Sequence, residues 1–311
     1  MIKVYKDTII SYFMVALTGM MALWKLANIT KLNNIIFVLL LVIIPLYAIA
    51  CVLFYNNIAT KRFKKITTEI LNTCQTQKGL NFLFGLRKGK VNNPVDLVVT
   101  MHIVNYLRVY GKNTFALNLL LQYDAEKLFK ANRFIAHKFI YYSNLAACYY
   151  RLGKKEEAQK AYNIADELYN RSNFPQKAKE TCKTTHQLNR LIILGDGEKD
   201  DQLLALLSTQ IADKKDLLSQ VQANFYIASI LFKRGETEKI KEHIEFVREN
   251  GGDTVFARCA LANNFSDEFL KKIDAEPYEP EPIKIKYHKV LILSVAVTIL
   301  IIALAVLILA L

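Results

Sequence analysis

The chain of 311 residues combines 52% hydrophobic residues with a formal net charge of +13, and its mean hydropathy is +0.16. So many apolar residues exclude an intrinsically disordered chain, and only 6 prolines and 11 glycines exclude collagen-like and low-complexity classes. The shortage of glycine also argues against a doubly wound nucleotide-binding fold, which needs glycine-rich phosphate loops.

The apolar residues are concentrated at the two ends of the chain. Three segments without a charged residue, at residues 8–24, 35–55 and 290–311, are long enough to predict transmembrane helices. The first segment has an alternative interpretation as a cleaved signal segment, since lysines precede it. We expect an N-terminal transmembrane hairpin over residues 1–56 and a C-terminal transmembrane helix.

Basic residues beside the apolar segments predict an orientation in the membrane. Residues 57–96, which we expect to form a basic juxtamembrane connector, carry 8 basic and 2 acidic side chains. Residues 275–289 are expected to form a linker rich in Pro and Glu that ends in a basic flank. Since positive residues stay on the cytoplasmic side, the sequence predicts a multi-pass integral membrane protein with three spans, whose N-terminus and repeat domain are cytoplasmic. The 5 cysteines include no C-x-x-C pair, which agrees with a reducing compartment.

Residues 97–274 contain an internal repeat. Four glycines, each between two stretches of helical apolar periodicity, are separated by 42, 42 and 40 residues: Gly111, Gly153, Gly195 and Gly235. A glycine at such a place supplies the left-handed conformation that ends a helix. The pattern predicts an all-α fold, an alpha-solenoid of helical hairpins that stack to bury their apolar faces. Residues 255–269 are expected to form a capping helix.

One of these units resembles the tetratricopeptide repeat (TPR) family. Residues 139–172 match its alternation of large and small residues at Tyr142, Leu145, Ala146, Tyr149, Gly153, Ala158, Tyr162 and Ala165. The other three units keep the apolar stripe but fewer of the small residues. Their period near 42 residues exceeds the 34 of the TPR family and lies within the 40–47 of HEAT and armadillo repeats. HEAT-like hairpins therefore remain an alternative for the degenerate units.

The resemblance implies that the first helices of the hairpins line a concave groove that holds a peptide. The repeat register places ten residues on this partner-binding surface: Met101, Asn105, Arg108, Ser143, Asn144, Tyr150, Thr185, Asn189, Ser229 and Phe232. The family's binders of chaperone tails clamp a terminal carboxylate with lysine, arginine and asparagine, and Asn105 and Asn144 occupy the asparagine positions. The cationic positions hold Met101, Cys182 and His186, so the resemblance does not extend to that clamp.

The sequence shows no pattern of catalytic, cofactor-binding or metal-binding residues. The 5 histidines are scattered, and there is no Walker loop and no G-x-S-x-G elbow. We therefore expect a non-enzymatic protein that needs no cofactor and no metal. Nucleic acid is not an expected partner, because the 26 basic side chains of residues 97–274 are interleaved with 22 acidic ones.

The sequence therefore predicts a membrane-anchored, TPR-like scaffold or adaptor, whose cytoplasmic solenoid binds a protein or peptide partner at the bilayer. The alternative is a structural subunit of a multi-pass membrane complex, in the assembly, secretion or envelope machinery, in which the spans make the main contacts. Neither the identity of the partner nor the oligomeric state is predicted.

Overall fold

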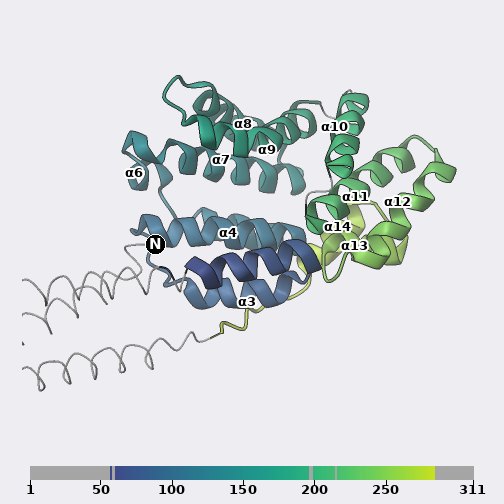
Figure 1. The fold of residues 1–311 in the computed structure, drawn as a ribbon, viewed down its shortest axis with the longest axis horizontal. Coiled ribbons are helices and arrows are strands. Elements are labelled where there is room, and N and C mark those ends of the chain that lie inside the picture. Colours follow the sequence, from purple (N-terminus) through teal and green to yellow (C-terminus); the bar gives the residue numbers. More distant parts are fainter. Residues whose placement is uncertain (1–56, 58–59, 196–198, 214–215, 284–311) are drawn as a thin grey trace, which may run out of the picture. The chain divides into compact units, whose positions relative to one another are not determined.

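The computed structural model describes residues 57, 60–195, 199–213 and 216–283, and in this part of the chain every regular element is a helix (Figure 1). This agrees with the predicted all-α class. The chain divides into two compact units, one of residues 66–283 and the other of the remaining residues at both ends. The fold described below is that of the unit of residues 66–283.

The localisation predicted from the sequence is corrected by the structure. Within the described residues, no helix is both long enough and apolar enough to cross a membrane. This finding overturns the prediction of an integral membrane protein with three spans and a cytoplasmic repeat domain, and it leaves the expected flanking transmembrane helices without support. The segments on which that prediction rested, residues 8–24, 35–55 and 290–311, lie outside the described residues.

Most of the helices pair into antiparallel hairpins that follow one another along the chain. The pairs α4–α5, α7–α8, α9–α10 and α11–α12 correspond to the four repeat units. In Figure 1, α7, α8 and α9 lie over α3 and α4. The bounds are α3 Thr76–Leu86, α4 Pro94–Tyr110, α5 Asn113–Leu120, α6 Ala125–Leu128, η1 Asn132–Phe134, α7 Ile135–Arg151, α8 Lys155–Asn170, α9 Gln176–Gly195, α10 Asp200–Ala212, α11 Leu217–Lys233, α12 Thr237–Asn250, α13 Val255–Ala262 and α14 Asp267–Ala275.

Three of the four repeat glycines adopt the expected left-handed conformation. Gly111, Gly153 and Gly235 have φ of 95°, 76° and 74°, and each follows the first helix of its hairpin. The amide of Gly111 donates to the carbonyl of Arg108 at 3.1 Å, which satisfies one of the free carbonyls at the end of α4. Gly195 is different, because it is the last residue of α9 and its φ is not positive. The expectation of a left-handed glycine is therefore wrong for the third unit.

The compact unit begins before the predicted repeat region. Residues 60–73 are helical, and they are followed by α3, so that a further pair of helices occupies the stretch expected to be a connector. Between them Cys74 is fully buried with a φ of 54°. Ile70 is only 2% exposed, and it lies on the same helical face as Ile66 and Cys74. That apolar face explains how the residues from Ile66 onward pack within the unit of residues 66–283.

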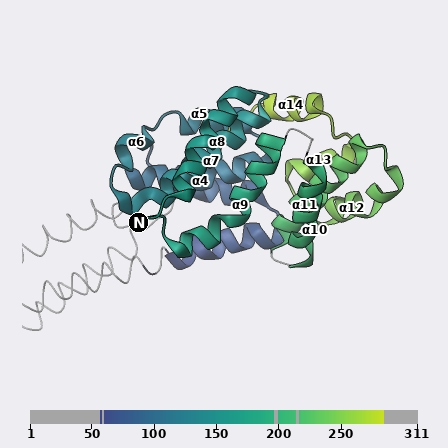
Figure 2. The ribbon, with the colours of Figure 1, turned by 90° about the horizontal axis from the view of Figure 1, so that it is seen from above.

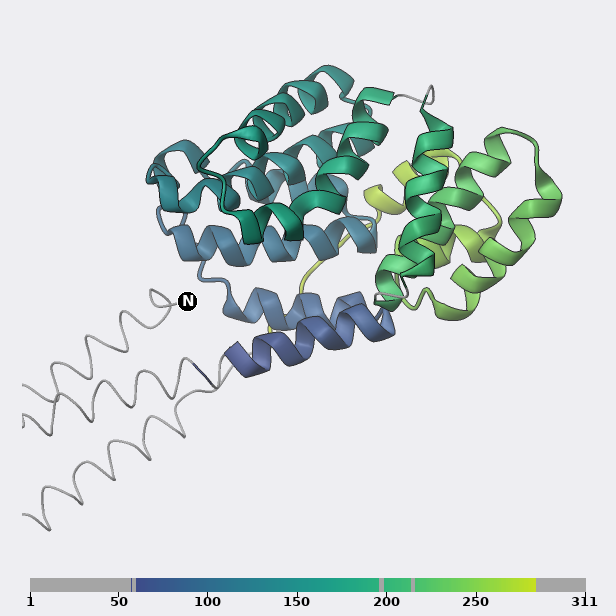
Figure 3. The same cartoon turned by 45° about the horizontal axis from the view of Figure 1, so that its top comes forward.

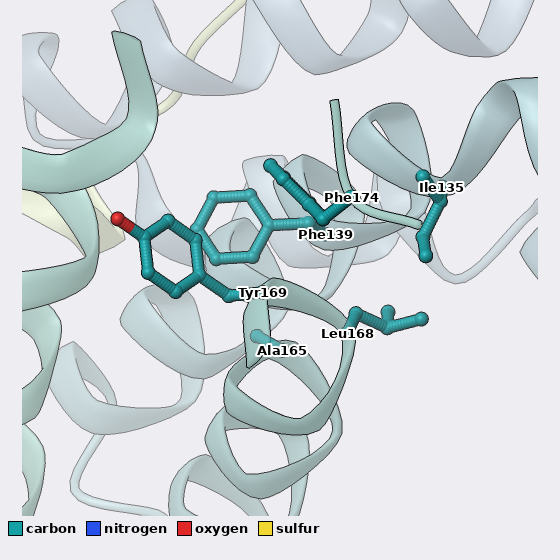
Figure 4. Close-up of a cluster of buried hydrophobic side chains, with 6 residues drawn as sticks. All are labelled: Ile135, Phe139, Ala165, Leu168, Tyr169 and Phe174. Carbon is teal, nitrogen blue, oxygen red and sulfur yellow. The ribbon is translucent and has the colours of Figure 1, made fainter. Parts of the chain in front are cut away.

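A cluster of buried apolar side chains joins α7 and α8. Figure 4 shows the side chains of Phe139, Tyr169 and Phe174 gathered on one side of α7 and α8. The ring centroid of Phe139 lies 5.6 Å from that of Tyr169 and 5.7 Å from that of Phe174. These distances are typical of favourable aromatic pairs. Ala158 and Ala165 are 0% and 1% exposed, so the two backbones approach closely at these small residues.

Where the sequence predicts one capping helix, over residues 255–269, the structure has two helices, α13 and α14. Thr254 accepts a hydrogen bond from the amide of Ala257 and begins α13, and Ser266 accepts one from Phe269 and begins α14. Between them Asn263 ends α13 in the left-handed conformation, with a φ of 49°. A single helix over residues 255–269 is therefore wrong, since a helix stop and a new N-cap lie inside that range.

The last helices contact the first ones, so the array of hairpins closes on itself (Figure 3). The carboxylate of Asp253 accepts hydrogen bonds from the amides of Thr76, at 2.6 Å, and Gln77, at 2.9 Å, and thereby caps α3. The amide of Thr114 at the start of α5 donates to Asp274 at 3.1 Å. Beyond α14 the chain is extended, and the amide of Ile283 donates to the carbonyl of Asn81 in α3 at 3.0 Å.

Candidate functional site

A groove of about 730 Å³ lies within the unit of residues 66–283. Its lining comes mainly from α4, α7, α9 and α11, the first helices of the four hairpins, and from α13 and α14. The contacts between helices run from α4 to α7, from α7 to α9, and through α10 to α11 (Figure 2). Because the array closes on itself, the first and last helices both reach this one groove.

The structure brings seven of the ten residues predicted for a partner-binding surface to this groove. They are Asn105, Arg108, Ser143, Asn144, Tyr150, Thr185 and Asn189. The other three lie elsewhere. Met101 is 3% exposed and belongs to the core. The hydroxyl of Ser229 donates to the carbonyl of Phe225 at 2.8 Å, and Phe232 is 51% exposed with its ring 5.7 Å from that of Phe265.

Arg151 and Tyr226 connect two sides of the groove. The guanidinium of Arg151, from the last turn of α7, donates to the hydroxyl of Tyr226 in α11 and lies 5.0 Å from the centre of its ring. Burial by itself raises the pKa of Tyr226, but the positive charges of Arg151 and Arg108, together with hydrogen bonds from Arg151 and Gln222, outweigh burial, and the pKa is lowered. The groove is therefore a place where negative charge is favoured.

A second polar group lies where α4 and α7 meet. The Nη1 of Arg108 donates to Oδ1 of Asn144 at 3.3 Å. Ser143 and Asn144 are only 5% and 4% exposed, although both carry polar side chains. Nε of Arg108, Oγ of Ser143 and Nδ2 of Asn144 are buried without a hydrogen-bond partner among the described residues, and so is Oδ1 of Asn113 nearby in the lining.

The charged side chains that line the groove are mostly basic. Five are cationic and two are anionic: Arg108, Arg151, Lys155, Lys233 and Lys271 against Asp267 and Asp274. One of the two carboxylates, that of Asp274, accepts hydrogen bonds from Thr114. The lining therefore has a net positive charge, although the acidic residues of α14 give it one negative side.

Two of the described histidines have different surroundings, since His186 lies in an aromatic cluster and His102 in the groove lining. His186 is stacked on Tyr169 with ring centroids 4.1 Å apart, and its Nε2 lies 2.7 Å from Oδ1 of Asp166. These contacts hold α9 against α8. His102 lines the groove, and burial lowers its pKa, as does the neighbouring charge of His137. No group of three potential metal ligands is found in the described part of the chain.

Arg151, Gln222 and Tyr226 also line the groove, although the repeat register did not predict them. A signal for the arginine was present, since three first helices carry a basic residue in their last turn, shortly before the glycine: Arg108, Arg151 and Lys233. A cation there is favoured by the negative end of the helix dipole. No local pattern could have indicated Tyr226, which lies 75 residues from Arg151 along the chain.

In comparisons with known proteins, no family model, no curated protein and no solved structure matches this chain. The site must be interpreted from its own geometry. It offers hydrogen-bond donors, positive charge and a lining of mixed apolar and polar side chains. Such a surface can hold a ligand that carries carbonyl or carboxylate oxygens.

Proposed function

We propose that this chain is a scaffold or adaptor built from TPR-like helical hairpins, and that its groove binds a segment of a protein partner. The role is one of binding rather than catalysis. The observation that carries the proposal is the set of polar atoms, on Arg108, Asn113, Ser143 and Asn144, that are buried in the groove lining without a partner.

Unpaired buried polar atoms are rare because each costs about 1–3 kcal/mol. Four of them in the lining of one groove favour a ligand that supplies the missing bonds. A peptide backbone suits this pattern, since every residue of an extended segment offers a carbonyl oxygen and an amide hydrogen. The donors on Arg108, Ser143 and Asn144 would pair with carbonyl oxygens, and Oδ1 of Asn113 would accept from an amide.

The apolar part of the lining supports the same proposal. Phe225, Phe256 and Leu218 face the groove together with the polar residues. Surfaces that recognise proteins combine an apolar centre with a few precisely placed polar groups. A volume of about 730 Å³ leaves room for several side chains of a bound segment.

The proposed relation to TPR hairpins rests on α7 and α8. The small residues that the family places between its two helices are buried here, with Ala146 and Ala158 at 0% exposure. The repeat spacing of 40–42 residues remains closer to HEAT repeats. We propose TPR-like packing for this hairpin and lengthened, degenerate versions of it for the others.

A selection experiment tests the function. The full chain is immobilised and exposed to a library of random peptides that are acetylated and amidated at their ends. The variant Asn105→Trp places a large ring at an exposed position of the groove lining. Lys160→Trp is the matched control, because Lys160 is exposed on α8 and is not part of the lining.

We expect the wild-type chain and Lys160→Trp to retain the same peptides, and Asn105→Trp to lose most of them while its thermal unfolding is unchanged. If no peptide is retained by the wild-type chain, or if Asn105→Trp and Lys160→Trp bind equally well, the groove is not a peptide site.

A further inference from the structure

Two guanidinium groups reach the groove from neighbouring hairpins. Arg108 lies in the last turn of α4 and Arg151 in the last turn of α7. Their hydrogen-bond partners are neutral groups, the side-chain oxygen of Asn144 and the hydroxyl of Tyr226. Within the described residues, neither guanidinium forms an ion pair with a carboxylate. Half-buried arginines in such a position normally have an anionic partner.

The surrounding groups are also suited to an anion. Nε of Arg108, Nδ2 of Asn144 and Oγ of Ser143 can each donate a hydrogen bond, and all three are buried without a partner. Ser143 and Asn144 are more than nine-tenths buried, so their positions are fixed by the packing of α7. A rigid set of donors beside two guanidiniums is the arrangement that binds carboxylates strongly.

The lowered pKa of Tyr226 is consistent with the charge of these two arginines. A half-buried phenol ordinarily has a raised pKa, yet the positive charge of Arg151 and Arg108 lowers the pKa of Tyr226. The field at this point of the groove therefore stabilises a negative charge more than burial disfavours it.

We infer that Arg108 and Arg151, with Asn144 and Tyr226, form a carboxylate-binding subsite, and that the partner presents an internal Asp or Glu side chain to it. This inference rests on the proposed function. It differs from a clamp for a chain terminus, because Arg108 and Arg151 do not occupy the cationic positions of the family's clamp, and Arg151 and Tyr226 meet across the groove.

The rest of the lining limits how acidic the partner segment can be. Lys155, Lys233 and Lys271 add positive charge, whereas Asp267 and Asp274 on α14 would repel further carboxylates. The charge of Asp267 also acts on Arg151. We therefore expect one strongly preferred acidic position within an otherwise mixed segment, rather than a run of acidic residues.

The selection with end-blocked peptides provides the test, since these peptides have no free carboxyl terminus. The affinity of one enriched peptide, and of the same peptide with its preferred acid replaced by the amide, is measured by fluorescence anisotropy. The full-length chains are wild type, Arg108→Gln, Arg151→Gln, Arg151→Lys and the matched control Lys160→Gln. Thermal unfolding of each variant shows whether it is folded.

An Asp or Glu should be enriched at one position. Its replacement by the amide should weaken binding about tenfold or more, as should Arg108→Gln and Arg151→Gln. The peptide whose acid is replaced by the amide should bind the arginine variants almost as well as it binds the wild type. The reason is that the peptide change and the arginine change remove the same interaction. Arg151→Lys should retain part of the affinity, and Lys160→Gln all of it.

Three results would overturn the inference. Enrichment of neutral or basic peptides alone would leave the groove as a peptide site but remove the carboxylate subsite. If the selection is repeated with peptides whose carboxyl terminus is free, binding that appears only with those peptides would assign the arginines to a chain end. Retention of no peptide in either selection would overturn the proposed function, and the subsite with it.

Discussion

The second and third hairpins differ in how much of each is buried. In α7 and α8, buried residues run along both helices, and the aromatic cluster around Phe139 joins them. In α9, which has 20 residues, only His186 and Gly195 are buried. In α10 the buried residues are Leu203, Leu207 and Gln210. The hairpin that matches the TPR pattern is thus tightly packed, and its neighbour is loosely packed.

The difference shows what the small and aromatic residues of the pattern achieve. Where alanines let two helices approach, aromatic rings fill the remaining space and fix the hairpin. Where the pattern is lost, the inner helix keeps polar residues such as Thr185 and Asn189 facing the groove. The groove therefore has one largely buried wall, made by α7, and one more exposed wall, made by α9.

The largest loss of stability is expected for the variant Phe139→Ala. Phe139 is 1% exposed and contacts the rings of Tyr169, Phe174 and His186, so its truncation should lower the free energy of unfolding by about 3–5 kcal/mol. Leu194→Ala, at a residue of α9 that is 37% exposed, should cost about 1 kcal/mol or less. Urea denaturation followed by circular dichroism measures both, and equal losses would show that the two hairpins are equally well packed.

A smaller effect is expected at the closure of the array. If α9 and α10 are the weak link, the contacts between the ends must help to hold the hairpins together. Asp253 caps α3 from the other end of the domain, so Asp253→Ala should cost about 1–2 kcal/mol. The control Asp124→Ala removes only a local cap on the short helix α6 and should cost less in the same denaturation experiment. A reversed order would mean that closure adds little stability.

The repeat glycines give a third, finer comparison. Gly153 has a φ of 76°, a conformation that an L-residue adopts at a cost of about 1–2 kcal/mol, so Gly153→Ala should lower stability by that amount. Gly195 has no such φ, and a Cβ there would lie 3.1 Å from that of Lys199, which needs only a small shift. Gly195→Ala should change stability by about 0.5 kcal/mol or less. Equal losses in thermal denaturation would show that both glycines are conformationally required.

The sequence predicted the features that repeat and missed those that occur once. Periodic apolar stripes and the glycines at 111, 153 and 235 indicated the hairpins, because each unit specifies its own local structure. Gly195 misled because glycine permits a left-handed conformation without requiring it. The sequence did not predict that the helices of residues 66–86 belong to the compact unit, because the basic residues led to the assignment of residues 57–96 as a juxtamembrane connector.

The candidate site shows the same division. Seven lining residues followed from the repeat register, since one face of each first helix points in the same direction. Tyr226 contacts Arg151, which lies 75 positions away along the chain. Asp253 caps α3 at Thr76, which lies 177 positions away. Such contacts arise from the closure of the array, and no local pattern encodes them.

The smallest predicted effect is the dependence of peptide affinity on pH. It tests whether the hairpin of α9 and α10 holds α11 close to α7. The lowered pKa of Tyr226 means that its phenol loses a proton below pH 10, the value for an unperturbed tyrosine. The phenolate would then occupy the field of Arg151 and Arg108 and repel a carboxylate ligand. Binding of an acidic peptide should therefore weaken about two- to fivefold as the pH rises through that pKa, while the lysines are still charged.

Tyr226→Phe removes the titrating group but keeps the ring that lies against Arg151. Its affinity for the same peptide should remain constant over this pH range, as measured by fluorescence anisotropy. Lys160→Gln should keep the pH dependence of the wild type. If the wild type and Tyr226→Phe respond to pH in the same way, the hydroxyl of Tyr226 does not reach the two arginines in solution. The less buried hairpin of α9 and α10 would then let α11 move away from α7.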